Sequence, residues 1–290
     1  MKIKTILVPT DFSETANHAV EQALEVAIAT GATMHLFHVV EPRADEPGVV
    51  SALSDYVARL EKDAETSLAL KVDVLRGNGV DVFYETARHV SPLDAISDAT
   101  ERLEPDLLVM GTHGRSGLGR LVLGSVTEKV LRHVPSNVLT LRKKAPVVRA
   151  AHAFERVLVP VDFSEFSSRA VRMAASLLVP GGELHVAHVV ASPIHPSFYA
   201  GGITRLFELD PEMPKRIRDQ LVDWLEGQDV QEITVREGDI FSELMDVAAS
   251  AKAQLVVMGT RGLTGLDHLL MGSVSEKMVR VSGVPVLTVR

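Results

Sequence analysis

Two glycine-rich stretches have residue types and a spacing that suit the binding of an anion. GTHGRSGLGRLVLGSV spans residues 111–126, and GTRGLTGLDHLLMGSV spans residues 259–274. Each follows an apolar run and leads into a helical pattern that opens with a Gly-Ser pair. The start of a helix presents unpaired backbone N–H groups and the positive end of its dipole, which together favour a phosphate. Glycines let the main chain approach an anion without a Cβ and permit turns with positive φ. The repeated spacing Gly-x2-Gly-x9-Gly-Ser therefore predicts a phosphate cradle.

Common nucleotide and hydrolase fingerprints do not explain these stretches. The sequence has no GxxxxGK[ST], and no GxGxxG follows the first apolar run, so the P-loop and dinucleotide motifs are excluded. GRSGLG misses the nucleophile elbow GxSxG because Leu118 stands where the last glycine belongs. A flexible surface loop is the simpler alternative, and two copies with identical long spacing disfavour it.

The two stretches differ in charge. The first contains His113, Arg115 and Arg120, whereas the second contains Arg261 followed by Asp267 and His268. A carboxylate close to a polyphosphate is unfavourable unless it reaches a metal ion. We therefore expect both stretches to bind and the first to bind more tightly.

Short apolar runs alternate with helical patterns along the whole chain. Runs rich in Val, Ile and Leu are typical of strands buried on both faces of a parallel sheet. A helix is expected from Ser13 to Gly31, where the glycine ends it. The other expected helices are 51–70, 92–103 and 125–133, and the expected strands are 3–9, 34–40, 80–87, 106–110 and 137–142, with 156–161, 183–190, 231–237, 254–258 and 285–289 in the second half. This alternation predicts doubly wound α/β layers with parallel sheets, whose ligands bind beyond the carboxyl ends of the strands.

The chain is also an internal duplication. ILVPTDFSE at 6–14 returns as VLVPVDFSE at 157–165, and LLVMGTHG at 107–114 returns as LVVMGTRG at 255–262. Near-constant spacing over such blocks indicates a duplicated domain. We expect one domain at 1–145, a solvated linker at 146–154 and a second domain at 155–290.

The amino-acid composition limits the cellular compartment and the classes of binding partner that we expect for this protein. The 290 residues carry a formal charge of −8, and neither half is basic, which argues against binding to nucleic acid or an anionic membrane. No cysteine is present, which excludes disulfides and thiolate chemistry and fits a reducing compartment. No apolar stretch approaches the roughly 20 residues of a membrane span, and the first residues do not form a secretory signal. We expect a cytoplasmic protein.

With these motifs assembled, the sequence resembles the universal stress protein family in its tandem form. The resemblance rests on PTDFSE after the first strand, HVV at the end of the second and G-x2-G-x9-G-S after the fourth. It implies five-stranded Rossmann-like or flavodoxin-like layers and an ATP site in each repeat. There the aspartate contacts the ribose, backbone groups of the second strand meet the adenine, and the Gly/Ser loop holds the phosphates. The implied binding residues are Asp11, Val39, Gly111, Gly114, Gly124, Ser125 and Val126, with Arg115 added for its charge, and Asp162, Val189, Gly259, Gly262, Gly272, Ser273 and Val274. For Asp11 and Asp162, capping of the following helix is the alternative role.

Three functions remain open at this stage. The first is a regulatory stress-response protein whose conformation or protein partner responds to ATP, ADP or AMP, with Mg²⁺ bridging the phosphates. The second is a slow ATPase, although no base or catalytic residue is nominated. The third is a scaffold or small-ligand binder without nucleotide. The family pairs through its last strand, which implies a homodimer or an internal pseudo-dimer of the two repeats.

The histidines are not expected to bind a metal as pairs. His35/His38 and His185/His188 are three residues apart within strand patterns, which places the members of each pair on opposite faces. His38 and His188 are expected to hydrogen-bond near the end of the second strand. A zinc site formed by His188, His195 and a carboxylate is a weaker alternative.

Overall fold

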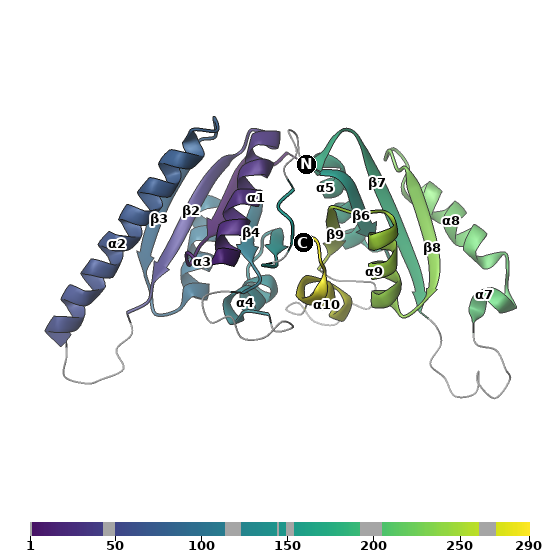
Figure 1. Ribbon diagram of the computed structural model, residues 1–290. Helices are drawn as coiled ribbons and strands as arrows, with labels where there is room; N and C mark the ends of the chain where they lie inside the picture. The colour runs from purple at the N-terminus through teal and green to yellow at the C-terminus, as the bar shows by residue number, and fades with distance from the viewer. Residues whose placement is uncertain are drawn as a thin grey trace. The chain divides into compact units, whose positions relative to one another are not determined.

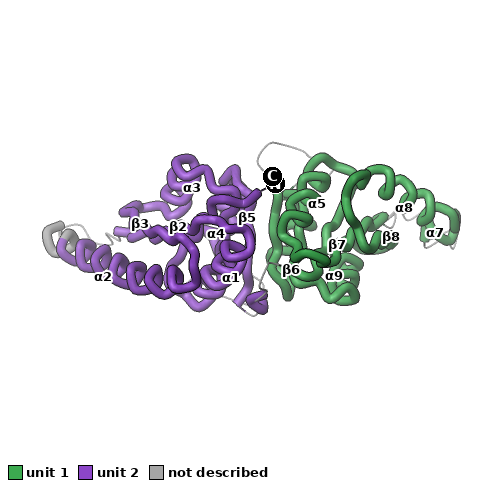
Figure 2. The backbone as a smooth tube through the Cα atoms, turned by 90° about the horizontal axis from the view of Figure 1, so that it is seen from above, with its two compact units in different colours: residues 1, 154–290 green, residues 2–153 purple. Residues whose placement is uncertain are grey.

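A computed structural model describes residues 2–42, 50–113, 123–143, 145–148, 154–191, 205–260 and 271–290, with the backbone alone described at 50–54. The chain forms two compact units, one of residues 2–153 and one of residues 154–290 together with residue 1 (Figure 2). Gly114, Arg115 and Gly262 of the predicted cradles lie outside the described residues, as do Arg120, Arg261, Asp267, His268 and His195. The domain limits and the linker at 146–154 stay predictions.

The first unit is an all-parallel sheet in the order β3-β2-β1-β4-β5 (Figure 1). Its strand order reverses between β1 and β4, which opens a crevice at their carboxyl ends. Helices α1 and α2 contact each other and cover one face, and α3 and α4 cover the other. The elements are β1 (Thr5–Pro9), α1 (Glu14–Thr30), β2 (Thr33–Val40), α2 (Val50–Arg76), β3 (Val82–Arg88), α3 (Pro92–Leu103), β4 (Leu107–Gly111), α4 (Ser125–His133) and β5 (Val138–Leu141).

The second unit repeats this topology in the order β10-β9-β6-β7-β8. Its elements are β6 (Phe154–Pro160), α5 (Glu165–Leu177), β7 (Leu178–Ala191), α7 (Leu206–Leu209), α8 (Met213–Trp224), β8 (Glu232–Gly238), α9 (Ile240–Ser250), β9 (Leu255–Gly259), α10 (Ser273–Val281) and β10 (Val286–Val289). The predicted α/β fold with parallel sheets is therefore confirmed.

The central strands explain why the sequence shows apolar runs in place of alternation. Ile6, Leu7 and Val8 of β1 are completely buried, as are Leu107, Leu108 and Val109 of β4. Helices cover both faces of a parallel sheet, so each residue of a central strand faces a helix. This burial gives each unit its core and fixes the two strand ends that frame the crevice.

Local signals set several helix limits. Ser13 caps the start of α1, because its hydroxyl accepts from the Ala16 amide, and Gly31 ends the helix in the left-handed region. Helices α3 and α4 have the predicted limits. The prediction of 51–70 for α2 is too short, since that helix continues to Arg76.

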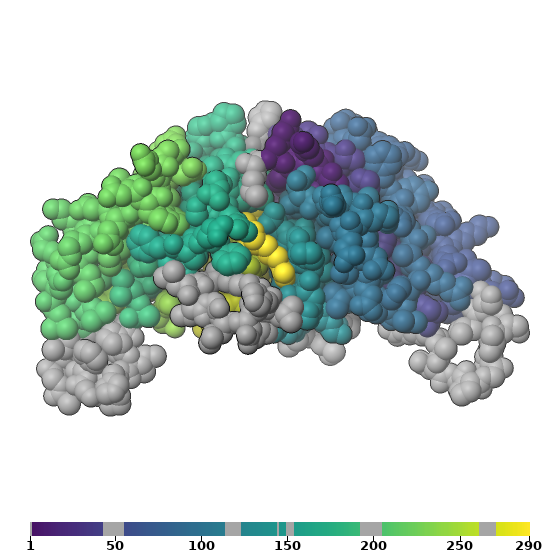
Figure 3. Space-filling model, turned by 180° about the vertical axis from the view of Figure 1, so that it is seen from behind, coloured from purple at the N-terminus to yellow at the C-terminus, as the bar shows by residue number. Residues whose placement is uncertain are grey.

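The second unit departs from the first beyond its second strand. The long helix α2 corresponds there to the four-residue α7 and the separate α8, with Pro211 and Pro214 close to their junction. The buried carboxylate of Glu237 accepts from the backbone amides of Leu206 and Phe207, and so holds the start of α7 against the end of β8. Helix α8 is mostly exposed and contributes to the outer surface of its unit (Figure 3).

Candidate functional site

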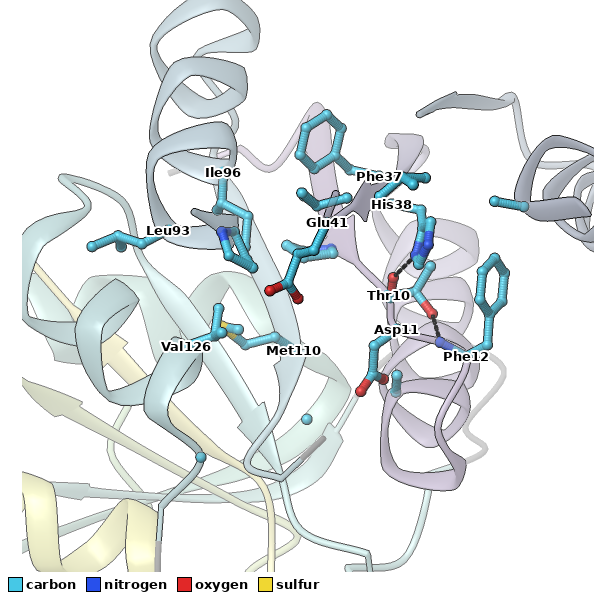
Figure 4. Close-up of a pocket in the computed structure, with 18 of the residues that line it drawn as sticks. Thr10, Asp11, Phe12, Phe37, His38, Glu41, Leu93, Ile96, Met110 and Val126 are labelled. Carbon is cyan, nitrogen blue, oxygen red and sulfur yellow. Dashed lines mark hydrogen bonds between the residues drawn. The ribbon is translucent and has the colours of Figure 1, made fainter. Parts of the chain in front are cut away.

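A tight turn follows β1 and presents the first candidate carboxylate. The Ser13 amide donates to Asp11 Oδ1 at 3.0 Å, and the Phe12 amide donates to Thr10 Oγ1 at 3.1 Å. Because Ser13 supplies the cap of α1, the alternative in which Asp11 caps this helix is wrong. Asp11 is instead held by its own turn, with its carboxylate directed into the crevice (Figure 4).

Phe12 adopts a backbone conformation that side chains rarely tolerate. Its φ is 63°, in the left-handed region, where a residue with a Cβ is strained by about 1–2 kcal/mol. Phe12 packs against the buried cluster of Val40, Val57 and Ala64, and its ring centroid lies 4.6 Å from that of His38. This packing offsets the strain, and the turn thereby directs Asp11 away from the core and toward the cavity.

The end of β2 is joined to the same turn through a histidine. His38 Nδ1 lies 2.7 Å from the Thr10 carbonyl oxygen and donates to it, since a carbonyl can only accept. The expected hydrogen bond near the strand end is therefore present. It fixes the distance between β1 and β2 where Val39 and Glu41 reach the cavity.

The predicted cradle is formed by the end of β4 and the start of α4. Gly124 is the N-cap of α4, no side chain caps that helix, and the Gly124 amide donates to the Thr112 carbonyl at 2.7 Å. The Thr127 hydroxyl donates to the Gly111 carbonyl at 2.7 Å, which ties the helix start to the strand end. Because Gly124 has no side chain, the N-cap position itself offers no acceptor to the first amides of α4, which suits an anion site.

The glycines at the strand ends and helix starts allow close packing of the main chain, and their backbone φ angles are ordinary. Gly111, Gly124, Gly259 and Gly272 do not use the positive φ that glycine permits. A Cβ on Gly111 would lie 2.7 Å from Thr15 Cγ2, and one on Gly124 would lie 3.0 Å from the Thr112 carbonyl oxygen. Contacts this short explain why no side chain fits at either point.

These pieces open into one cavity of about 1010 Å³. Figure 4 shows Asp11 and Glu41 turning their carboxylates into it, opposite the Met110 and Val126 side chains. The structure brings together the predicted residues Asp11, Val39, Gly111, Gly124, Ser125 and Val126 around this space. Sequence reasoning missed the walls, which include Glu41, Tyr56 and Asp63, Leu93 and Ile96 of α3, and Lys129 of α4.

His113 adds a polar atom to this cavity. Its Nδ1 lies 2.9 Å from Thr112 Oγ1, whereas its Nε2 is buried and has no hydrogen-bond partner among the residues that the structure describes. Burial of a nitrogen without a partner is costly unless a ligand or water completes it. The sequence placed His113 beside the cradle but gave no sign of this arrangement.

The second unit repeats the backbone of the site. The Ser164 amide donates to Asp162 Oδ1 at 3.1 Å, Phe163 has a φ of 64°, and His188 Nδ1 lies 2.8 Å from the Val161 carbonyl oxygen. Ser164 caps α5, so here too the aspartate is not the cap.

The cradle of the second unit has the same frame. Gly272 is the N-cap of α10 without a side-chain cap, and the Ser275 hydroxyl donates to the Gly259 carbonyl at 2.9 Å. Val189 lies in β7 near its end, and Ser273 and Val274 form the first turn of α10. These positions match those of the first unit.

The two histidines of the first pair have different partners. His35 stacks on Phe83 while His38 bonds the Thr10 carbonyl, as expected for opposite faces of a strand. Within the described ranges, no group of three His, Asp or Glu side chains is placed to hold a metal ion. Among the described helices, none combines the length and apolar character of a membrane span.

Comparison with known proteins agrees with this architecture. The model of the universal stress protein family matches residues 2–142 and again residues 153–290. The chain therefore belongs to the universal stress protein family, with two such domains in tandem.

Two curated relatives each match about half of this chain. A universal stress protein of Thermus aquaticus is 35% identical over 146 residues, which cover 48% of this chain and 98% of the relative. One from Methanocaldococcus jannaschii is 30% identical over 141 residues, covering 48% of this chain and 82% of the relative. A solved universal stress protein structure from Archaeoglobus fulgidus matches the whole chain at a TM-score of 0.75 and 23% identity, with 99% of its own chain covered, and supports the fold.

Proposed function

We propose that the crevice of the first unit binds an adenine nucleotide, ATP or its products, and that the protein acts as a nucleotide-responsive regulator in the stress response. The observation that carries the proposal is the shared cavity. A helix start without a side-chain cap and a carboxylate held by its own turn open into the same space. A ribonucleotide combines the groups that these two features recognise, namely phosphates and a ribose diol.

The parts of the cavity fit the parts of the ligand. The amides of Ser125 and Val126 would bind phosphate oxygens, and the Asp11 carboxylate would accept hydrogen bonds from the ribose hydroxyls. The apolar side chains of Leu93, Ile96 and Met110 offer a surface for the base, next to the backbone of Val39.

The steric crowding at the cradle supports the same assignment. Gly124 lets the main chain pass close to the Thr112 carbonyl, where a Cβ would be crowded. His113 Nε2 is buried and could form a hydrogen bond with a phosphate oxygen. A divalent cation such as Mg²⁺ would neutralise the phosphates when bound. Asp11, Glu41 and Asp63 are the carboxylates lining the cavity that could contribute to its coordination.

We infer regulation by binding in preference to rapid turnover. Phosphoryl transfer needs a group that orients or activates the attacking nucleophile. His113 and Lys129 can supply positive charge, but neither is hydrogen-bonded to a lining carboxylate in the described structure. Sustained phosphate release that disappears in Asp11→Ala would instead support a slow ATPase.

The first test is direct detection of the ligand. Denatured, freshly purified protein should release adenine nucleotide, identified by mass spectrometry. Added ATP with Mg²⁺ should raise the melting temperature, because a ligand bound only by the native state stabilises it in proportion to ln(1 + [L]/Kd). A cavity that belongs to a scaffold without nucleotide would give neither signal.

Asp11→Ala tests the proposed contact with the ribose. Loss of two charge-assisted hydrogen bonds should weaken binding to the first unit by about 100-fold, as measured by isothermal titration calorimetry. Asp98→Ala, an exposed change on α3 away from the cavity lining, controls for net charge. Equal affinities of these two variants for ATP would contradict the assignment.

A further inference from the structure

The aspartates of the two repeats have different surroundings. In the second unit, the Ser167 hydroxyl donates to Asp162 Oδ1 at 3.0 Å, in addition to the 3.1 Å bond from the Ser164 amide. The Asp162 amide in turn lies 3.4 Å from Ser167 Oγ. Ser167 is buried in the first turn of α5, so this contact is part of the packed turn.

The matching residue of the first unit cannot make this contact. PTDFSETA at residues 9–16 aligns with PVDFSEFS at residues 160–167, so Ala16 stands where the second repeat has Ser167. Ala16 is also buried in the first turn of its helix, and it lines the cavity. The two units thus share a turn, a strand end and a helix start, and the hydroxyl of Ser167 beside Asp162 has no counterpart on Ala16.

That hydroxyl competes for the atom that a ribose would use. A carboxylate oxygen has two lone pairs, and Asp162 Oδ1 already accepts from one amide and one hydroxyl. A ribose diol that binds Asp162 must therefore displace the Ser167 hydrogen bond or rely on Oδ2.

A second acceptor is within reach of the Ser167 hydroxyl when a ligand displaces it from Asp162. The Ser164 carbonyl oxygen lies 2.9 Å from Ser167 Oγ and can accept the same proton. That exchange replaces a charge-assisted hydrogen bond with a neutral one, which is roughly half as strong. The penalty for a ligand is consequently moderate, and it does not close the site.

We propose that Ser167 makes the second unit the weaker ribonucleotide site, so that the chain is filled in order, first unit before second. This inference rests on the proposed function and adds the residue that separates the two affinities. Ser167 acts through Asp162 as a positioning residue. Exchanging one hydroxyl between positions 16 and 167 should then exchange the order of filling.

The experiment uses the full chain with one site disabled at a time. In an Asp11→Ala background, which reports the second unit, Ser167→Ala should tighten binding of ATP with Mg²⁺ by about three- to tenfold in calorimetry. In an Asp162→Ala background, which reports the first unit, Ala16→Ser should weaken it by a similar factor. Matched controls are Ser168→Ala, at the next position of α5, and Ala29→Ser, near the end of α1 and away from the cavity lining, and each should leave affinity within about twofold.

A second ligand separates this role from a general effect on folding. Because 2′-deoxy-ATP offers one hydroxyl fewer to the carboxylate, Ser167→Ala should improve its binding less than that of ATP. Melting temperatures of all variants are measured without ligand, so that a loss of folded protein is recognised directly. The Ala16→Ser arm remains informative even if Ser167→Ala unfolds the second unit.

The outcomes distinguish the two proposals. If the unmodified chain takes up no nucleotide, the proposed function fails. If it binds ATP but Ser167→Ala weakens the second site, or Ala16→Ser tightens the first, Ser167 helps to hold the carboxylate for the ribose and the inference is overturned. Unchanged affinities in both exchanges overturn it as well.

Discussion

The two repeats are alike in backbone and unlike in the side chains that surround it. Both place an aspartate in a turn closed by the amide two residues later, a phenylalanine at positive φ and a histidine bonded to a strand-end carbonyl. Both start the cradle helix at a glycine that has no side-chain cap. The backbone frame thus tolerates large changes in its neighbours.

The neighbours differ in ways that bear on binding. In the first unit the continuous helix α2 lines the cavity, whereas the second unit has α7 and α8 at the corresponding place in the sequence, with α7 held by Glu237. Phe12 packs on the α2 side of its unit, and the Phe163 ring lies 5.8 Å from Trp224 of α8. The same backbone frame is thus accompanied by different helices in the two units.

The largest contrast is expected at the two cradle glycines. An added Cβ at Gly124 would lie 3.0 Å from the Thr112 carbonyl oxygen, but one at Gly272 would lie 3.5 Å from the Thr260 carbonyl oxygen. Overpacking of this kind costs about 1–3 kcal/mol, so Gly124→Ala should lower the free energy of unfolding by about 1–2 kcal/mol more than Gly272→Ala. Both variants lose the same preference for glycine at an N-cap, which cancels in the comparison.

Urea unfolding measures this contrast. Circular dichroism reports the whole chain, and the fluorescence of Trp224, the single tryptophan of the sequence, reports the second unit. Equal effects of the two glycine variants would show that the approach of the Thr112 carbonyl does not require glycine. For binding studies, Gly272→Ala is the cleaner change because it leaves ordinary contacts.

A smaller contrast is expected within each strained turn. Phe163→Ala and Phe163→Gly both delete the ring that packs on Trp224, but only alanine keeps a Cβ at positive φ. The glycine variant should therefore be more stable by about 1 kcal/mol, read from Trp224 fluorescence during urea unfolding. Phe12→Ala and Phe12→Gly should show the same order by circular dichroism. An alanine variant as stable as its glycine partner would mean that the turn relaxes once the ring is gone.

The smallest effect concerns a pair of matched histidines. Burial, helped by the nearby Arg102 and opposed by Glu85, holds the pKa of His35 below its usual value, while its ring stacks on Phe83. In the unfolded chain this histidine takes up a proton near pH 6.5, at which point the folded form still resists protonation. Its contribution to stability is thus present above pH 6.5 and is lost as the pH falls toward the folded pKa.

His35→Leu should flatten that part of the stability curve between pH 8 and 5.5, measured by thermal unfolding. His185, at the matching position, lies between Glu183 and Glu232 at 3.1 and 3.2 Å. His185→Leu is the matched control and should leave the contribution of His35 in place. An unchanged pH dependence in His35→Leu would assign it to other groups.

Features written in local sequence could be predicted. Ser13 and Gly31 set the limits of α1, and helices α3 and α4 have the predicted bounds, because caps and periodicity act over a few residues. The duplication in the sequence places Asp11 and Asp162 at equivalent strand ends.

Features that depend on distant packing could not be predicted. Tyr56 and Asp63 reach the cavity because α2 crosses the sheet near it, and no local pattern reports that crossing. The positive φ of Phe12 contradicts the ordinary preference of an aromatic residue and is possible only because α2 packs on its ring. The role proposed for the Ser167 hydroxyl depends on its contact with the Asp162 carboxylate, five residues earlier and across a turn.

The hydroxyl of Thr127, like that of Ser275 in the other repeat, joins the end of a strand to the first turn of a helix. In each unit, this hydrogen bond should therefore make the end of the strand and the start of the helix move together as one rigid part. If the crevice of the first unit narrows around a ligand, we expect the movement in α2, on the other side of the cavity. This helix packs on the sheet through the buried apolar side chains of Val57, Ala64 and Leu68. Apolar contacts can shift without breaking a hydrogen bond. Ligand binding should therefore change the amide hydrogen exchange of α2 and not that of α4.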